Sequence, residues 1–272
     1  MLKIDLKQIV KSRGLRIPGF IVSLLERIIH QDGLNEILRV THPHEGSEFA
    51  DKVYLHLDLE IDASGWENVP AEGRFVFASN HPLGGLDGIG LVKILGKRYG
   101  DENIRVLVND MLMNVKPLSK VFLPVNKYGA QGRKGAKMIA EAYESDKQIV
   151  MFPAGLVSRM HPDGKIEDLE WQKSFVSKAA ESGRLIIPLI FGGLNRPRFY
   201  KLAKWRQRLG IKFNIEQIFL PSEVFASKGK KFTIRFLPPV DPSRLLQEGM
   251  TPKEIAGRIR ASLYGNLWKS LT

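Results

Sequence analysis

The chain has 272 residues, of which 43% are hydrophobic and 26% are charged, as is ordinary for a globular protein. These proportions exclude a disordered, collagenous or low-complexity chain. The absence of cysteine excludes disulfides, thiolate metal sites and a cysteine nucleophile. Lysine and arginine number 41 against 29 acidic residues, and the formal charge of +12 predicts an anionic partner: nucleic acid, an anionic lipid surface or an acidic protein.

Residues 1–51 read as a helical segment. Apolar residues recur at helical spacing in 20–29, after a basic stretch in 3–16. Apolar and polar residues then alternate strictly over 53–61, which predicts a half-buried strand. No uncharged apolar run approaches the roughly 18 residues of a membrane-spanning helix, and the N-terminus lacks the shape of a signal peptide. We therefore expect a protein that is not integral to a membrane.

From residue 74 onward, apolar strands alternate with helical stretches. Strands are expected at 74–80, 104–108, 121–125, 148–152, 185–191 and 231–237, and helices at 87–99, 133–145, 168–182 and 251–271. Such alternation predicts an α/β fold with a mixed, largely parallel sheet covered by helices. Residues 52–272 are expected to form this domain, and residues 1–51 a helical N-terminal appendage.

The segment from Asn80 to Asp87 is the most informative about chemistry, because it lies where a strand ends and a helix begins. His81 is the natural general base there. Residues six apart on a continuous helix cannot meet, but the pair Gly84–Gly85 lets the chain fold back. Asp87 can then hold one imidazole nitrogen and leave the other free to take a proton. The alternative is a loop histidine with Asp87 as a plain helix cap.

Four segments in this order resemble the motifs of the glycerolipid O-acyltransferases, the lysophosphatidate acyltransferase-like family. They are His81 to Asp87, 121–126, Phe152 to Arg159, and 187–190. Three departures stand out. Five residues rather than four separate the histidine from the aspartate, the arginine of the second motif is missing, and Ala154 replaces the glutamate of the third. With these departures the pattern is similar to a divergent bacterial branch, the hemolysin-like acyltransferases that act on lyso-aminolipids.

The resemblance implies transfer of a fatty acyl group from a thioester, on acyl carrier protein or coenzyme A, to the hydroxyl of a lyso-lipid. His81 would be the general base and Asp87 its orienting partner, with no metal and no further cofactor. Backbone amides of the glycine-rich loop or around Gly155 would stabilise the oxyanion. Substrate contacts are implied for Asn80, Gly84, Gly85, Asn126, Lys127, Phe152, Pro153, Gly155, Ser158 and Arg159.

The nature of the acceptor depends on the basic residues. A single arginine can clamp a carboxylate bidentately, and Arg159 is the candidate for an aminolipid acceptor. The alternative for Arg159 is a salt bridge within the protein. A lysophosphatidate or glycerol-phosphate acceptor remains open if Lys127 and Arg159 replace the missing arginines in space. A catalytically inactive lipid-binding module is the alternative from a different class.

Residues 196–212 contain seven basic side chains, no acidic one, and interleaved aromatic and apolar residues. This pattern is typical of a helix at a membrane interface, with the 20–29 helix as a second contact. The alternative is that both apolar faces pack on the sheet. We expect a peripheral protein at the cytoplasmic face of the inner (plasma) membrane. A nucleic-acid partner is not expected, because no helix-turn-helix, RNP or zinc-finger pattern is present.

Two further segments carry weak signals. His42, His44 and Glu45 are residue types that bind metals and lie close together in the sequence, but we interpret this segment as a capped turn. Lys127 to Lys134 has the position of a phosphate-binding loop but lacks the ending of a Walker motif. We interpret this stretch as a solvated start of a helix.

Overall fold

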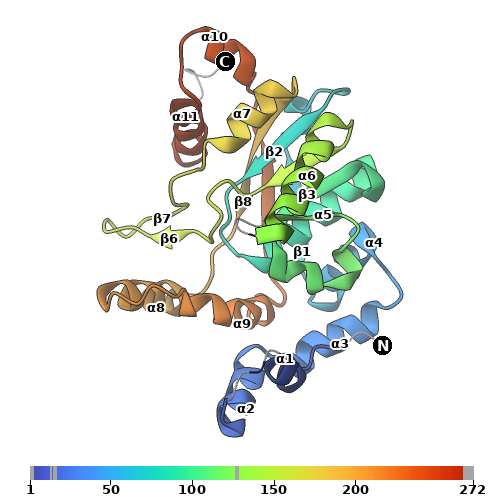
Figure 1. Cartoon of the computed structure of the whole chain (residues 1–272), viewed down its shortest axis with the longest axis vertical. Coiled ribbons are helices and arrows are strands. Elements are labelled where there is room, and N and C mark those ends of the chain that lie inside the picture. The colour runs from blue at the N-terminus through green and yellow to red at the C-terminus, as the bar shows by residue number, and fades with distance from the viewer. Residues whose placement is uncertain (1–2, 13, 15–16, 126–128, 266–272) are drawn as a thin grey trace.

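The computed structural model describes residues 3–12, 14, 17–125 and 129–265 (Figure 1). Its helices are α1 (Leu6–Ser12), α2 (Gly19–Ile28), α3 (Gln31–Thr41), α4 (Gly46–His56), α5 (Gly85–Tyr99), α6 (Gly129–Glu144), α7 (Ser174–Glu181), α8 (Pro197–Arg208), α9 (Leu220–Phe225), α10 (Pro242–Gln247) and α11 (Pro252–Tyr264). Its strands are β1 (Glu60–Ser64), β2 (Phe75–Ser79), β3 (Ile104–Asn109), β4 (Phe122–Val125), β5 (Gln148–Met151), β6 (Arg159–Met160), β7 (Ile166–Glu167), β8 (Leu185–Gly192) and β9 (Lys231–Phe236).

Seven of the strands form one sheet in the order β1-β9-β8-β2-β5-β3-β4. Strands β8, β2, β5, β3 and β4 are parallel to one another. Strand β9 runs antiparallel to β8 and carries β1 in parallel at the edge. The prediction of a mixed, largely parallel sheet is therefore confirmed. The short strands β6 and β7 form a separate hairpin.

Helices cover both faces of the sheet, so its central strands are buried on both sides (Figure 1). On β2, Phe75 and Phe77 point toward the core formed with α4 and α5. Val76 and Ala78 point the other way, toward the core formed with α6, α7 and α11. The sheet is therefore the middle of three layers, and β2 packs against helices on both of its faces. The loop that follows β2 is held by the layers on either side.

Helices α1 to α3 lie at one end of the molecule, as expected for a helical N-terminal segment (Figure 1). Helix α3 rests on α9, because the ring of His30 stacks on Phe225 with centroids 5.1 Å apart. Helix α4 runs across the predicted boundary between residues 51 and 52, so the division of the chain into two parts stays a prediction. None of the described helices is long and apolar enough to cross a membrane.

The prediction of a strand over 53–61 is wrong. The same residues also carry a helical pattern: α4 buries Phe49 and Val53 on one face, and Leu57, directly after the helix, is buried as well. Leu55, which the alternation would have buried, is 70% exposed. The helix ends at His56, and strand β1 begins only at Glu60. Helical spacing prevails because this face packs against α5, so tertiary contacts decide between the two periodicities.

The predicted helices differ from the observed ones at their ends: α5 begins two residues and α6 four residues before the predicted start. The helix expected over 168–182 is α7, which begins at Ser174, because the residues before it form β7 and a loop. The C-terminal helix begins as expected, with Thr251 and Glu254 forming a reciprocal cap. It is described to Tyr264, and the rest of the predicted span, 266–271, lies outside the described residues.

Gly90 on α5 tests the packing of α4 against α5. A Cβ there would lie 2.5 Å from the hydroxyl of Tyr54 and 2.8 Å from the side chain of Ile61. We expect Gly90→Ala to lower the free energy of unfolding by about 1–3 kcal/mol, because the buried neighbours must shift. Urea unfolding measures the change. As a control, Gly257→Ala on α11 meets no atom within 4 Å and should stabilise by up to about 1 kcal/mol. Equal stability of the two variants would contradict this packing.

Candidate active site

The site begins where β2 leaves the sheet. The side-chain amide of Asn80 donates to the carbonyl of Phe191 at 3.0 Å, and the Phe191 N–H donates back to its oxygen at 2.7 Å. Asn80 thus extends the pairing of β2 with β8 by one residue through its side chain. These bonds determine the point from which His81 projects, and they occupy the polar atoms of Asn80. The substrate contact implied for Asn80 stays a prediction.

His81 and Asp87 meet, although six positions separate them. The distance from His81 Nδ1 to Asp87 Oδ2 is 3.0 Å, and the Asp87 side chain is fully buried. The backbone N–H groups of Leu83 and Gly84 also donate to Oδ2, at 2.9 and 3.1 Å, and that of Gly88 to Oδ1 at 2.9 Å. Asp87 therefore orients the imidazole and caps α5 at once.

The turn between them depends on Gly84. Its φ is +85°, a conformation that favours glycine. A Cβ at this position would also lie 3.0 Å from Leu220 and 3.2 Å from Val157. Gly85, the first residue of α5, has no such constraint. Gly84 is thus the member of the pair that lets the chain fold back.

The ring of His81 is 18% exposed and stacks on Phe152, with centroids 4.1 Å apart. Burial alone would lower its pKa, but the carboxylate of Asp87 and, less strongly, that of Asp168 outweigh burial. The guanidinium of Arg159 opposes them, and the pKa of His81 is raised above its usual value. An imidazole with a raised pKa stays protonated to a higher pH than a free histidine does.

Asp168 is a site residue that the sequence did not reveal. One of its oxygens accepts from the His81 N–H at 3.1 Å and from the Ser158 hydroxyl at 2.6 Å, and the other from the Trp171 indole at 2.9 Å. Burial raises the pKa of Asp168 above its usual range, against these donors. The helix predicted over 168–182 includes Asp168 as its first residue. The one local signal is Trp171, an aromatic residue in an otherwise polar stretch, three positions after Asp168.

The segment from Phe152 to Ser158 is fastened to the first motif. The Ser158 N–H donates to the His81 carbonyl at 2.8 Å, so the two segments run against each other behind the imidazole. Pro153 is buried and its carbonyl accepts from Gln172 at 3.0 Å. Gly155 is exposed, has a φ of +66°, and donates its N–H to the Phe152 carbonyl at 2.9 Å. The third segment thus forms a tight turn beside His81.

Arg159 points into the protein interior. Its guanidinium donates to Glu216 at 2.8 Å and to the Val157 carbonyl at 2.7 Å. Glu216 also pairs with Arg206 of α8 at 2.8 Å, and the three side chains are buried together. This is the salt-bridge alternative for Arg159, in a buried rather than a surface form. An acceptor clamp at Arg159 stays a prediction, and it would have to compete with Glu216.

Several of the expected oxyanion donors are already engaged. The N–H groups of Leu83, Gly84 and Gly88 bind Asp87, and that of Gly155 binds the Phe152 carbonyl. These four amides therefore serve the loop geometry. The candidate substrate contacts Asn126 and Lys127 lie outside the described residues.

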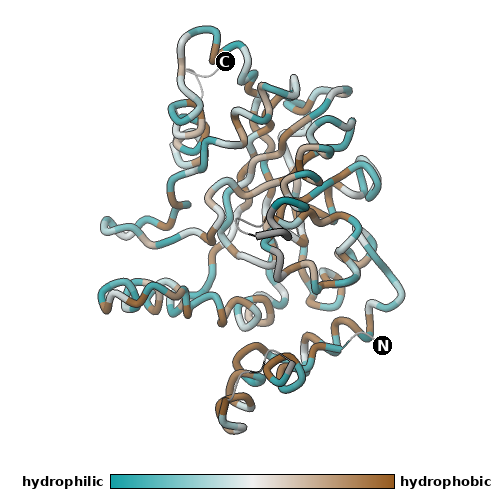
Figure 2. The backbone as a smooth tube through the Cα atoms, in the orientation of Figure 1, coloured by the Kyte–Doolittle hydropathy of each residue, from teal (hydrophilic) through white to brown (hydrophobic). Residues whose placement is uncertain are grey.

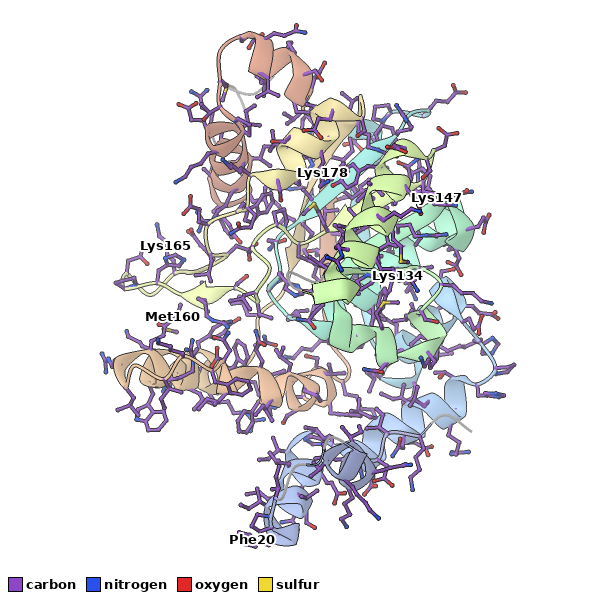
Figure 3. The ribbon with its side chains drawn as sticks, viewed as in Figure 1. Phe20, Lys134, Lys147, Met160, Lys165 and Lys178 are labelled. Atoms are coloured by element: carbon purple, nitrogen blue, oxygen red, sulfur yellow. The ribbon has the colours of Figure 1, made fainter. Side chains whose placement is uncertain are left out.

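The residues of the suggested metal cluster make ordinary surface contacts. His44 Nδ1 pairs with Glu48 at 2.8 Å, and Glu45 pairs with Lys120. Within the described ranges, no three potential metal-ligating side chains come together. Of the basic residues in the suggested phosphate loop, Lys134 is exposed on α6 (Figure 3), and Lys127 is not described.

The histidine–carboxylate pair lies at the carboxyl end of a strand in a helix-covered α/β sheet, where the functional residues of open α/β sheets gather. The chain belongs to the acyltransferase family, whose sequence model matches residues 6–265. It is therefore an acyltransferase, as the resemblance of its motifs implied.

Two bacterial relatives cover nearly the whole chain. The lyso-glycine lipid O-acyltransferase of Bacteroides thetaiotaomicron is 40% identical over 265 residues, which is 96% of each chain. The protein of the same name from Phocaeicola vulgatus is 42% identical over 265 residues, 96% of this chain and 94% of its own. Among solved structures, the 1-acyl-sn-glycerophosphate acyltransferase PlsC from Thermotoga maritima aligns over 92% of each chain with 14% identity and a TM-score of 0.47.

The contact between Asp87 and His81 predicts a change in titration. Because Asp87 raises the pKa of His81, Asp87→Asn should lower that pKa and leave the ring neutral at a lower pH. An NMR titration of the imidazole, assigned through His81→Gln, measures the shift. The same titration of the unsubstituted protein is the reference. An unchanged His81 titration would show that the two side chains do not interact in solution.

Proposed function

We propose that the protein transfers a fatty acyl group from an acyl thioester to the hydroxyl of a lyso-lipid. The observation that carries the proposal is the contact between His81 and Asp87 at the end of β2, in a chain that belongs to the acyltransferase family. The two relatives named lyso-glycine lipid O-acyltransferase support a lyso-aminolipid acceptor, because their identity of 40% and 42% extends over almost the entire chain.

In the proposed mechanism, Asp87 accepts a hydrogen bond from the Nδ1–H group of His81, and Nε2 is left as the base. The lipid hydroxyl gives its proton to Nε2 as its oxygen attacks the thioester carbonyl. Asp87 stabilises the imidazolium that results, without taking its proton. The tetrahedral intermediate then breaks its carbon–sulfur bond, and the leaving thiolate takes the proton back from Nε2. This sequence needs no covalent enzyme intermediate.

His81→Ala should lower turnover by at least about 10²-fold, because general-base assistance contributes that much or more. The assay supplies a mixed pool of lyso-lipids and a long-chain acyl thioester, on acyl carrier protein or coenzyme A, and identifies products by mass spectrometry. A diacylated aminolipid, lost in His81→Ala, is the expected result.

Three other outcomes would change the proposal. Phosphatidate as the product would point to a lysophosphatidate acceptor. Full activity of a folded His81→Ala protein would remove His81 from the mechanism. A folded protein that binds vesicles but acylates no acceptor would make the chain a lipid-binding module.

We also propose that α8 and the segment after it contact an anionic membrane, as a peripheral protein at the cytoplasmic face would. Trp205 and Phe213 are 53% and 67% exposed, and Leu209 is exposed between them. Figure 2 shows hydrophobic residues over much of α2. Phe20, 77% exposed, lies at the far end of α2 (Figure 3). Exposed rings beside cations suit the headgroup region of a bilayer.

The seven cations of 196–212 divide into two sets. Arg196 and Arg198 pair with Glu223, and Arg206 pairs with Glu216, so these three have acidic partners outside the segment. The other four have no acidic partner within the described part of the chain: Lys201, Lys204, Arg208 and Lys212. An anionic surface would supply the missing charge.

Neutralising these four cations tests the membrane proposal. Each contributes roughly 1 kcal/mol near an anionic surface, so the fourfold glutamine variant should lose at least about 10²-fold in affinity for anionic vesicles. Co-sedimentation at two salt concentrations measures the loss. A matched control changes four exposed lysines elsewhere to glutamine: Lys97, Lys134, Lys137 and Lys253. Equal losses in both variants would indicate a general effect of net charge and no specific membrane face.

A further inference from the structure

Asp168 is a buried carboxylate for which the proposed mechanism has no use. It lies in the loop after β7 and is fully shielded from solvent. Its side chain accepts three hydrogen bonds, all from uncharged donors: the His81 N–H, the Ser158 hydroxyl and the Trp171 indole. Within the described residues, no lysine or arginine forms an ion pair with it. A buried charge held by neutral donors alone is costly and calls for a reason.

The position of Asp168 is held from the other end of the chain. Its N–H donates to the hydroxyl of Tyr264 at 2.9 Å, and its carbonyl accepts from Arg260 Nε at 3.0 Å. Both residues belong to α11, and Arg260 is in turn paired with Glu167 at 3.2 Å. The C-terminal helix therefore fixes the loop that carries Asp168.

The charges around His81 show what Asp168 can do there. Asp87 and Asp168 face His81 from two sides and raise its pKa, and the guanidinium of Arg159 opposes them. Glu216, to which Arg159 is bonded, also pairs with Arg206, so these three side chains together carry one net positive charge. Two carboxylates outweigh this charge, one bonded to the ring of His81 and the other to its backbone, so the surroundings of His81 are net negative.

We propose that Asp168 is a positioning residue for acyl transfer, an inference that rests on the proposed function. It fixes the main chain of His81 against Ser158, and its fixed negative charge stabilises the imidazolium that forms when His81 takes the hydroxyl proton. Asp168 itself exchanges no proton. The proton passes from the lipid hydroxyl to His81 Nε2 and from there to the leaving thiolate.

Asp168→Asn removes the charge and keeps the size of the side chain. We expect kcat to fall by between about 10-fold and 10²-fold, because the base is displaced and its protonated form is less stable. The acid limb of kcat/KM should also move to lower pH, because losing a negative charge lowers the pKa of His81. A residue that served packing alone would lower kcat without moving this limb.

A second pair of variants protects the test against misfolding. In Asp168→Asn the new amide N–H group faces the indole N–H of Trp171, and Trp171→Phe removes that conflict. The double variant is therefore compared with Trp171→Phe alone, and the acid limb should again move to lower pH. Glu170→Gln is the control for charge, because this exposed carboxylate two residues away pairs with Lys253 at the surface. It should leave the limb in place.

The outcomes separate this inference from the function on which it rests. An acid limb that stays in place, or moves to higher pH, in both Asp168 variants would overturn the role of Asp168. If His81→Ala also keeps its activity, the proposed function fails as a whole. If His81→Ala is inactive while the limb stays in place, only Asp168 is rejected.

Discussion

The burial of the Asp87 carboxylate is the constraint on which the site depends. A carboxylate taken out of water is stable only if most of its oxygen lone pairs find donors. Asp87 finds four, in the His81 ring and the N–H groups of Leu83, Gly84 and Gly88. All of them lie within eight consecutive residues. The hydrogen bonds to this one carboxylate therefore fix the backbone conformation of the junction between β2 and α5.

The same bonds explain why an unusual spacing is tolerated. An additional residue between the histidine and the aspartate has to be accommodated in the turn, and the positive φ of Gly84 does this. The start of α5 also presents free N–H groups and a partial positive charge, which favour a carboxylate at that place. Helix capping and orientation of the imidazole are therefore satisfied by one geometry. The spacing changes while the contact is kept.

Local patterns were sufficient to predict most of the sheet and the meeting of His81 with Asp87. The glycine pair between these two residues carries the information needed for the turn. The strand expected over 53–61 failed because two periodicities coexist there, and packing of α4 on α5 selects the helical one. This choice depends on residues far along the chain, which no local window contains.

Long-range partners also explain what else was missed. Asp168 reaches His81 across 87 positions, and no short motif indicates such a contact. The excess of positive charge in 196–212 was overestimated for the same reason, since its acidic partners Glu216 and Glu223 lie outside that segment. Composition gives only the net charge of the chain. Which cations remain available for a partner follows only from the fold.

These buried pairs also relate the proposed membrane face to the site. Trp205 is exposed on α8, while its neighbour Arg206 turns inward to Glu216, which holds Arg159. Arg159 directly follows Ser158, whose hydroxyl bonds Asp168 behind His81. Each link is buried, and buried ion pairs and hydrogen bonds hold their partners in defined positions. A helix lying on a membrane would therefore set the orientation of His81 relative to the bilayer that holds its acceptor, with no movement of the site required.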